Sequence, residues 1–280
     1  MVGPEGSISA RLSSTHRGYF WVGLAPPENI VFFEYQPGRN QEIPQELLKN
    51  FSGVLQSDGY ECYNTLSKRE DITLCCCLAH ARRYFEQSQG NDKVRSTHAL
   101  NVFGRLYDIE REHKESTPEE RLAARQQYAK PTWQEFGRWL EDQVGLLAPG
   151  SAIHKAFAYT MRRFKRLSRY MDDGTIKADN NLIENSIRPA ALGKKNYMFC
   201  GSHEGARRVA LLYSLIGTCR MHGINPVTWM TEVLRRISTH PKESIHELLP
   251  NHWKELNLEL AKNEPLPVIV RVDKSKRRTA

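Results

Sequence analysis

Four short β-type segments lie within the first 76 residues, and a long stretch of helical periodicity follows them. This contrast limits the folds that the chain can adopt. The expected strands are 19–22, 30–35, 54–56 and 72–76. They are rich in aromatic and β-branched residues, as strands usually are. The turn residues at 26–29 predict a hairpin for the first two strands. Short helices expected at 44–51 and 61–66 predict at least one parallel strand pair, and so an α/β fold.

The helical stretch, residues 92–170, contains three apolar stripes with the spacing of a helix face. They consist of Ala99, Val102, Phe103 and Leu106, then Trp133, Phe136, Leu140 and Val144, then Ile153, Phe157, Met161 and Phe164. Such stripes form a core by default. Thr117 followed by Pro118 predicts a helix start. We therefore expect an all-helical insertion inside the α/β fold.

Residues 172–204 are rich in turn-forming and polar residues, and helices are expected at 204–220 and 226–237. We expect a disordered lead-in at the N-terminus and a solvated basic tail at 271–280. The expected organisation is 1–17 lead-in, 18–91 first part of the core, 92–170 insertion, 171–240 second part of the core, and 241–280 C-terminal segment.

The formal net charge is +8, which favours a polyanionic partner such as nucleic acid. The longest uncharged apolar run, 209–219, is shorter than the roughly 20 residues that span a bilayer. No apolar signal segment stands at the start of the sequence. Three of the six cysteines are adjacent, which predicts reduced, buried thiols rather than a disulfide framework. These features predict a cytoplasmic protein without a membrane span.

Asp58 is the first candidate for chemistry. It follows an expected strand and precedes Gly59, so it is expected at the carboxyl end of that strand. Ligands of open α/β sheets gather at this edge. Asp-Gly is also a very common turn pair, so an ordinary turn aspartate is the alternative.

The second candidate is the segment from Asp179 to Asn185. Asn180 or Asn181 can cap a helix, and Glu184 then lies one turn inside it. Asp179 and Glu184 both suit the positive N-terminal end of such a helix. A capping arrangement with an ordinary carboxylate is the alternative.

Separated carboxylates that a fold brings together can hold Mg²⁺ ions for phosphodiester chemistry. The region after Glu184 is basic and includes Tyr197 and Phe199, which could stack on unpaired bases. Its candidate DNA-binding residues are Arg188, Lys194, Lys195, Arg207 and Arg208. A solvated basic loop is the alternative.

The run Cys75-Cys76-Cys77 lacks a second Cys or His pair at metal-ligand spacing, so buried small hydrophobic residues are favoured over zinc ligands. His80 and Arg83 follow this strand. They could support the site, contact DNA or simply lie on the surface.

Three motifs together resemble the insertion-sequence-66 family of transposases. The sequence at 56–63, Gln-Ser-Asp-Gly-Tyr-Glu-Cys-Tyr, is similar to the family's Asp-Gly-Tyr-x-x-Tyr motif. Residues 77–85 resemble its Cys-x-Ala-His-Ala-Arg-Arg-x-Phe motif, and residues 179–189 resemble its Asp-Asn-Asn-x-x-Glu motif. The resemblance covers roughly residues 17–255 in one colinear order.

The resemblance implies a DDE-type catalytic domain with a ribonuclease H-like fold. Asp58 would be the second catalytic acid and Glu184 the third, and both would bind Mg²⁺ or Mn²⁺. His80, Arg83 and Asp179 would support the site or contact DNA. The implied activity is metal-dependent cleavage of transposon ends and strand transfer into target DNA. The implied setting is the bacterial nucleoid, in a homo-oligomer that accessory proteins of the same element could join.

This sequence departs from the family pattern in one respect. The family's first acid lies in an Asp-Glu-Thr segment upstream of the strand at 19–22, and no aspartate precedes Asp58 here. The upstream zinc-finger-like and helix-turn-helix regions have no counterpart either. We therefore expect a truncated core that lacks its first strand and is inactive alone. A non-catalytic DNA-binding or interaction fragment is the first alternative, and a stand-alone ribonuclease H-like nuclease is the second.

Overall fold

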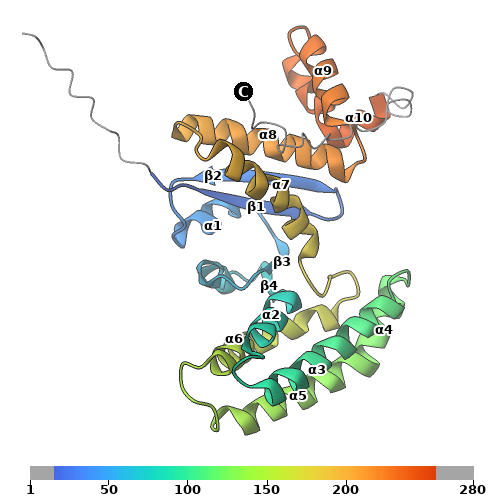
Figure 1. Ribbon diagram of the computed structural model, residues 1–280. Coiled ribbons are helices and arrows are strands. Elements are labelled where there is room, and N and C mark those ends of the chain that lie inside the picture. Colours follow the sequence, from blue (N-terminus) through green and yellow to red (C-terminus); the bar gives the residue numbers. More distant parts are fainter. Residues whose placement is uncertain (1–15, 257–280) are drawn as a thin grey trace, which may run out of the picture. The chain divides into compact units, whose positions relative to one another are not determined.

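The computed structural model describes residues 16–256 and divides the chain into two compact units (Figure 1). The hairpin unit comprises Met1–Gly38 and Asn185–Ala280, and the helical unit comprises Arg39–Glu184. Residues 1–15 of the expected lead-in lie outside the described residues, as does the whole expected tail at 271–280.

The hairpin unit begins with two antiparallel strands, β1 (Tyr19–Ala25) and β2 (Ile30–Gln36). They pair in register from Tyr19 opposite Gln36 to Ala25 opposite Ile30. Asn29 closes the turn with a positive φ of 52°, a conformation that asparagine tolerates better than most residues. The predicted hairpin is confirmed.

Helix α8 (His203–Met221) satisfies the edge of β2 that β1 leaves unpaired. The backbone amide of Phe33 donates to the Ser214 hydroxyl at 2.7 Å, and that of Val31 donates to the Thr218 hydroxyl at 3.2 Å. An exposed strand edge would offer these amides to another chain. The two hydroxyls therefore protect this edge while apolar side chains of both elements pack together.

Helix α7 (Asn181–Tyr197) corrects the expectation of a turn-rich stretch at 172–204. The helix continues through Pro189 and Gly193, two residues that usually interrupt helices. A Cβ atom added to Gly193 would lie 2.3 Å from the Tyr213 hydroxyl of α8. Gly193 thus leaves room for the Tyr213 hydroxyl, and its presence does not indicate a turn.

The C-terminal part of the hairpin unit consists of α9 (Pro226–Arg236), the 3-10 helix η4 (Lys242–Leu248) and α10 (Pro250–Leu256). Their shared core is formed by Cys219, Ile224, Trp229, Val233, Leu248 and Trp253. The Trp229 indole donates to the Leu248 carbonyl at 3.0 Å, which satisfies its buried N–H.

The helical unit contains one parallel strand pair, β3 (Gly53–Ser57) and β4 (Ile72–Cys76), with the 3-10 helix η1 (Glu61–Lys68) between them. This confirms the predicted parallel pair. Helix α1 (Glu42–Leu47) starts two residues before Pro44. Proline is tolerated at this position because the first amides of a helix have no intrahelical partner. It ends before the expected boundary at 51.

Helices fill the rest of this unit. They are α2 (Leu78–Ser88), α3 (Lys93–Glu112), α4 (Pro118–Ala124), the π-helical turn η2 (Arg125–Ala129), α5 (Lys130–Val144), α6 (Ala152–Ser168) and the 3-10 helix η3 (Arg169–Asp172). The three predicted apolar stripes all contribute to one core. Thr117 caps α4 in a capping box with Glu120, as its position before Pro118 predicts.

The described residues therefore form a mixed α/β structure in which helices dominate and each sheet has two strands. The ribonuclease H-like core and the five-part domain organisation stay predictions. None of the described helices has both the length and the apolar character needed to cross a membrane.

Candidate active site

Asp58 follows β3 directly, at the carboxyl end of the parallel pair. Its Oδ1 accepts a hydrogen bond from the Tyr60 amide at 2.9 Å, and Gly59 between them has a φ of +81°. This geometry is an Asx turn, so the carboxylate does fulfil the turn role. The side chain is nevertheless exposed, and Oδ2 accepts no hydrogen bond from the described part of the chain. The turn role therefore leaves one carboxylate oxygen for a ligand.

Two side chains of α6 hold the backbone at Asp58. The Tyr159 hydroxyl donates to the Asp58 carbonyl at 2.6 Å, and the Arg163 guanidinium donates to the Gly59 carbonyl at 2.7 Å. Neither residue was expected from the sequence to act near the site. Their spacing of four residues on an amphipathic helix is the signal that could have indicated them.

The segment at 177–180 is fastened to the same edge of the strand pair. The Gln56 amide donates to the Lys177 carbonyl at 2.7 Å, and the Leu78 amide donates to the Ala178 carbonyl at 3.1 Å. The Asn180 amide also donates to the Cys77 thiol at 3.4 Å. Gln56 lies near the end of β3, and Cys77 follows β4 directly. These hydrogen bonds therefore hold the start of α7 at the ends of the two strands.

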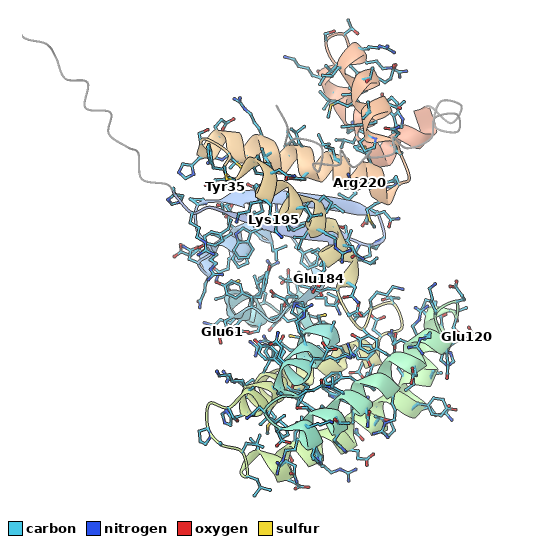
Figure 2. The ribbon with its side chains drawn as sticks, viewed as in Figure 1. Tyr35, Glu61, Glu120, Glu184, Lys195 and Arg220 are labelled. Atoms are coloured by element: carbon cyan, nitrogen blue, oxygen red, sulfur yellow. The ribbon has the colours of Figure 1, made fainter. Side chains whose placement is uncertain are left out.

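Glu184 lies in the first turn of α7, as the helix-start hypothesis predicts (Figure 2). Arg83 Nη2 lies 3.3 Å from its Oε2, and His80 Nε2 lies 3.3 Å from its Oε1. Both side chains come from α2, whose N-terminus follows β4. The structure thus brings three of the predicted site residues into contact, while their roles stay predictions.

Asp179, rather than Asn180 or Asn181, supplies the side-chain hydrogen bonds at the start of α7. Its Oδ1 accepts from the Asn181 amide at 3.1 Å and its Oδ2 from the Asn181 side chain at 2.8 Å. The Tyr107 hydroxyl also hydrogen-bonds to Asp179, and burial together with this nearby charge raises the pKa of Tyr107. The Asn180 Oδ1 is buried and accepts no hydrogen bond from the described residues, so this side chain does not cap the helix.

Three buried polar atoms around Glu184 make no hydrogen bond within the described residues: Glu184 Oε1, which has only the 3.3 Å approach of His80 Nε2, Asn180 Oδ1 and His80 Nδ1. Buried polar groups are normally satisfied, so such a cluster is typical of a site that binds something. Two of the three are oxygen donors, the ligand type that Mg²⁺ prefers.

The described residues include no group of three or more His, Cys, Asp or Glu side chains that could hold a metal ion by themselves. Magnesium is commonly bound through one or two carboxylates together with water and substrate phosphates. The carboxylates of Glu184 and Asp58 are ligands of the type that such an open site uses, and they do not form a closed structural metal site within the described residues.

The predicted DNA-binding residues differ in their charge balance. Arg188, Lys194 and Lys195 are exposed on α7. Arg207 and Arg208 both form ion pairs with Glu204, at 3.6 and 3.3 Å. The ion pairs reduce the positive charge that these two arginines can present to phosphates.

The thiols of Cys75, Cys76 and Cys77 are all buried, which confirms the interpretation of this run as small hydrophobic residues. Burial raises the pKa of the Cys75 thiol from 9.0 to about 11, so the group stays protonated at neutral pH. It is therefore neither a thiolate nucleophile nor a metal ligand at that pH.

Comparisons with known proteins agree with the motif assignment. Residues 8–208 match the family described as "Transposase IS66 family", and residues 214–251 match the "IS66 C-terminal element". Two Sinorhizobium fredii proteins are each 34% identical to this chain: "Uncharacterized protein y4hP" over 249 residues and "Uncharacterized protein y4jD" over 243 residues. These alignments cover 83% and 84% of this chain but 45% and 47% of the relatives, so the chain spans about half of their length. No solved structure matches significantly. The chain belongs to the IS66 family of transposases.

Proposed function

We propose that this chain carries part of the active site of a transposase that cleaves DNA and transfers strands with Mg²⁺ or Mn²⁺. The observation that carries the proposal is the cluster of unsatisfied buried atoms around Glu184, at the same strand edge as Asp58. Oxygen donors at the carboxyl end of a parallel pair suit a divalent cation in phosphodiester chemistry.

Asp58 and Glu184 would hold the metal, which when bound activates a water or hydroxyl and stabilises the leaving oxygen. Arg83 balances the charge of Glu184 in the absence of a ligand, and His80 contacts the same carboxylate. Because Arg83 is half exposed, its guanidinium can turn from the carboxylate to a substrate phosphate. Asp179 keeps the helix start in place, and with it the position of Glu184.

No aspartate precedes Asp58 in these 280 residues. As part of the proposal, Asp58 and Glu184 are the acids that these residues supply to the site. Its proposed partners are transposon-end and target DNA, further copies of the chain and accessory proteins of the element. Its proposed location is the bacterial cytoplasm, beside the nucleoid.

A non-catalytic DNA-binding role is the second candidate. It is favoured by the contacts that Arg83 and His80 make with Glu184, because these side chains compete with a metal for the carboxylate. The two candidates differ in one property that can be measured without any cleavage assay, which is saturable binding of Mn²⁺.

The test is Mn²⁺ binding by electron paramagnetic resonance, with the full chain and its Asp58→Asn and Glu184→Gln variants. We expect each variant to bind Mn²⁺ at least tenfold more weakly, since even outer-shell changes cost roughly 10–100-fold at metal sites. The matched control is Asp142→Asn, which removes an exposed carboxylate of α5 and should leave binding unchanged. Absence of saturable binding by the unmodified chain, or equal affinity in all three variants, would overturn the metal site.

A further inference from the structure

A basic groove lies in the helical unit between η1 and the C-terminal half of α6. Its volume is about 430 Å³. The charged side chains that line it are Arg162, Arg163, Lys165, Arg166, Arg169 and Glu61. Figure 2 labels Glu61, the acidic side chain in this lining, on η1. Five cations against one anion make the groove a strong candidate for an anionic ligand.

The sequence itself concentrates this charge. Residues 152–171, which form α6 and the start of η3, contain no aspartate or glutamate. The apolar stripe of α6 packs into the core, so the cations occupy the opposite face of an amphipathic helix.

Ion pairs do not neutralise these cations. Within residues 16–256, none of the five lies in an ion pair with a carboxylate, whereas Arg207 and Arg208 of α8 share Glu204. Unpaired cations held close together repel one another, and a bound anion relieves that repulsion. This arrangement is what a phosphate-binding surface requires and what a purely structural surface avoids.

Three of the arginines are held in position by neutral acceptors. Arg163 donates to the Gly59 carbonyl at 2.7 Å, and Arg169 donates to the Leu74 carbonyl at 2.6 Å. Arg166 donates to the Asn64 side chain. Neutral acceptors orient a guanidinium without cancelling its charge, so less conformational freedom is lost when a ligand binds. The groove is therefore ordered before any ligand arrives.

Arg162 and Lys165 are exposed at the groove, and their terminal nitrogens donate to no other described residue. Arg162 uses only its Nε, toward the Ala158 carbonyl of its own helix. These two side chains are thus available to a ligand, and they can be changed without removing a tertiary hydrogen bond.

The groove leads to the candidate catalytic acid. Arg163, which lines it, contacts the residue that follows Asp58, and Tyr159 one turn earlier contacts Asp58 itself. From Arg162 to Arg169 the chain advances about 10 Å at 1.5 Å per residue. One DNA strand places a phosphate roughly every 3.4 Å along the duplex axis, so this length of chain corresponds to about three base-pair steps and is enough for more than one phosphate.

We propose that this groove binds the backbone phosphates of a DNA strand and directs that strand toward Asp58. The part of this inference that concerns Asp58 rests on the proposed function, whereas phosphate binding by the groove does not. Guanidinium groups bind phosphate oxygens in a bidentate manner, and a row of cations along one helix suits the regularly repeated phosphates of a nucleic-acid strand.

The test uses the full chain and a labelled duplex, with EDTA present so that no metal contributes. Arg162→Gln with Lys165→Gln removes two groove cations. Because each phosphate contact contributes about 0.9 to the slope of log affinity against log salt, the slope should decrease by about 1.8. The control is Lys155→Gln with Arg138→Gln, which removes two exposed cations of α6 and α5 outside the groove. Its slope should change by less than half as much.

Equal slope changes in the two double variants would overturn the groove, since general charge would then explain both. The conservative pair Arg162→Lys with Lys165→Arg should retain the original slope, and loss of binding there would also count against the proposal. Displacement of the duplex by equimolar pyrophosphate would identify a small-anion site and refute strand binding. Duplex binding is measured in EDTA and Mn²⁺ binding is measured without DNA, so failure of the metal site and failure of the groove are separate results.

Discussion

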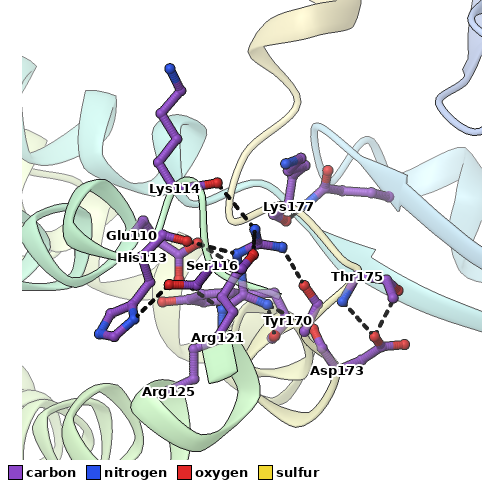
Figure 3. A network of polar contacts seen from close by, with 12 residues as sticks. Glu110, His113, Lys114, Ser116, Arg121, Arg125, Tyr170, Asp173, Thr175 and Lys177 are labelled. Atoms are coloured by element: carbon purple, nitrogen blue, oxygen red, sulfur yellow. Dashed lines mark hydrogen bonds and ion pairs between the residues drawn. The ribbon is translucent and has the colours of Figure 1, made fainter. Parts of the chain in front are cut away.

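Replacement of Arg125 by methionine should destabilise the helical unit by about 4 kcal/mol. Arg125 is fully buried, and its guanidinium forms two hydrogen bonds to Glu110, at 2.8 and 2.6 Å (Figure 3). It also donates to the carbonyls of Tyr170 and Asp173, at 2.8 and 2.7 Å. Methionine has a similar length but no donors, so the change leaves a largely buried carboxylate and two carbonyls without their partner.

The magnitude follows from these contacts. Breaking a buried ion pair from one side typically costs about 3–5 kcal/mol, because the remaining charge is uncompensated. Removing Glu110 as well, in Arg125→Met with Glu110→Met, eliminates that charge. The double variant should then lose only about 2 kcal/mol, roughly 1 kcal/mol for each of the two unsatisfied carbonyls.

Urea unfolding followed by far-UV circular dichroism measures these differences through the transition midpoint at constant slope. The control is Arg111→Met on α3, which breaks an exposed ion pair with Asp108 and should change stability by less than about 1 kcal/mol. A double variant as unstable as Arg125→Met would refute the reasoning, because the uncompensated charge of Glu110 would then contribute nothing.

Two further predictions concern Gly59 and Cys75. Gly59→Ala should destabilise the chain by about 2 kcal/mol in urea unfolding, because the residue has a left-handed φ and a Cβ would lie 2.6 Å from Arg163 Nε. The control is Gly104→Ala in α3, where a Cβ would meet open space, and this change should be neutral or stabilising. Equal losses of stability in the two variants would contradict the prediction. Burial raises the pKa of the Cys75 thiol in the folded state from 9.0 to about 11. The contribution of this thiol to the free energy of unfolding is therefore fully present below pH 9 and falls by about 1.4 kcal/mol per pH unit up to pH 11. Cys75→Ala should show a correspondingly shallower loss of stability in unfolding measured across this pH range, and an unchanged slope would exclude this thiol as the cause.

The local elements were predictable where composition and burial act together. The strand at 72–76 is β4 with the same bounds, because its apolar residues are buried on both faces and a turn at Asp71 precedes them. The extent of α7 was not predictable, because Gly193 is explained only by Tyr213 on another helix. A residue whose role depends on a distant partner has no local signal in one sequence.

Some features of the candidate site were likewise predictable from the sequence, and others were not. Asp58 and Glu184 were predictable from motifs and from their expected places at a strand end and a helix start. The helix start lies where it is expected, and the Asn180 carbonyl accepts its first hydrogen bonds, but the side-chain acceptor is Asp179 and not Asn180 or Asn181, because Asp and Asn are equally good capping residues by type. Only the structure shows that Asp179 accepts the hydrogen bonds of Asn181, while the Asn180 Oδ1 is buried and accepts none from the described residues.

The net charge of the chain is informative only when each cation is considered with its partners. The number of lysines and arginines along the sequence favours the region after Glu184 as the phosphate-binding surface. In that region, however, Arg207 and Arg208 share one carboxylate, that of Glu204. The cations of α6 are no more numerous, but they face neutral acceptors and lack carboxylate partners in the described chain. Electrostatic attraction for a phosphate depends on the charge left after such pairing. The groove beside α6 is therefore expected to contribute more to the salt dependence of DNA binding than the two arginines of α8.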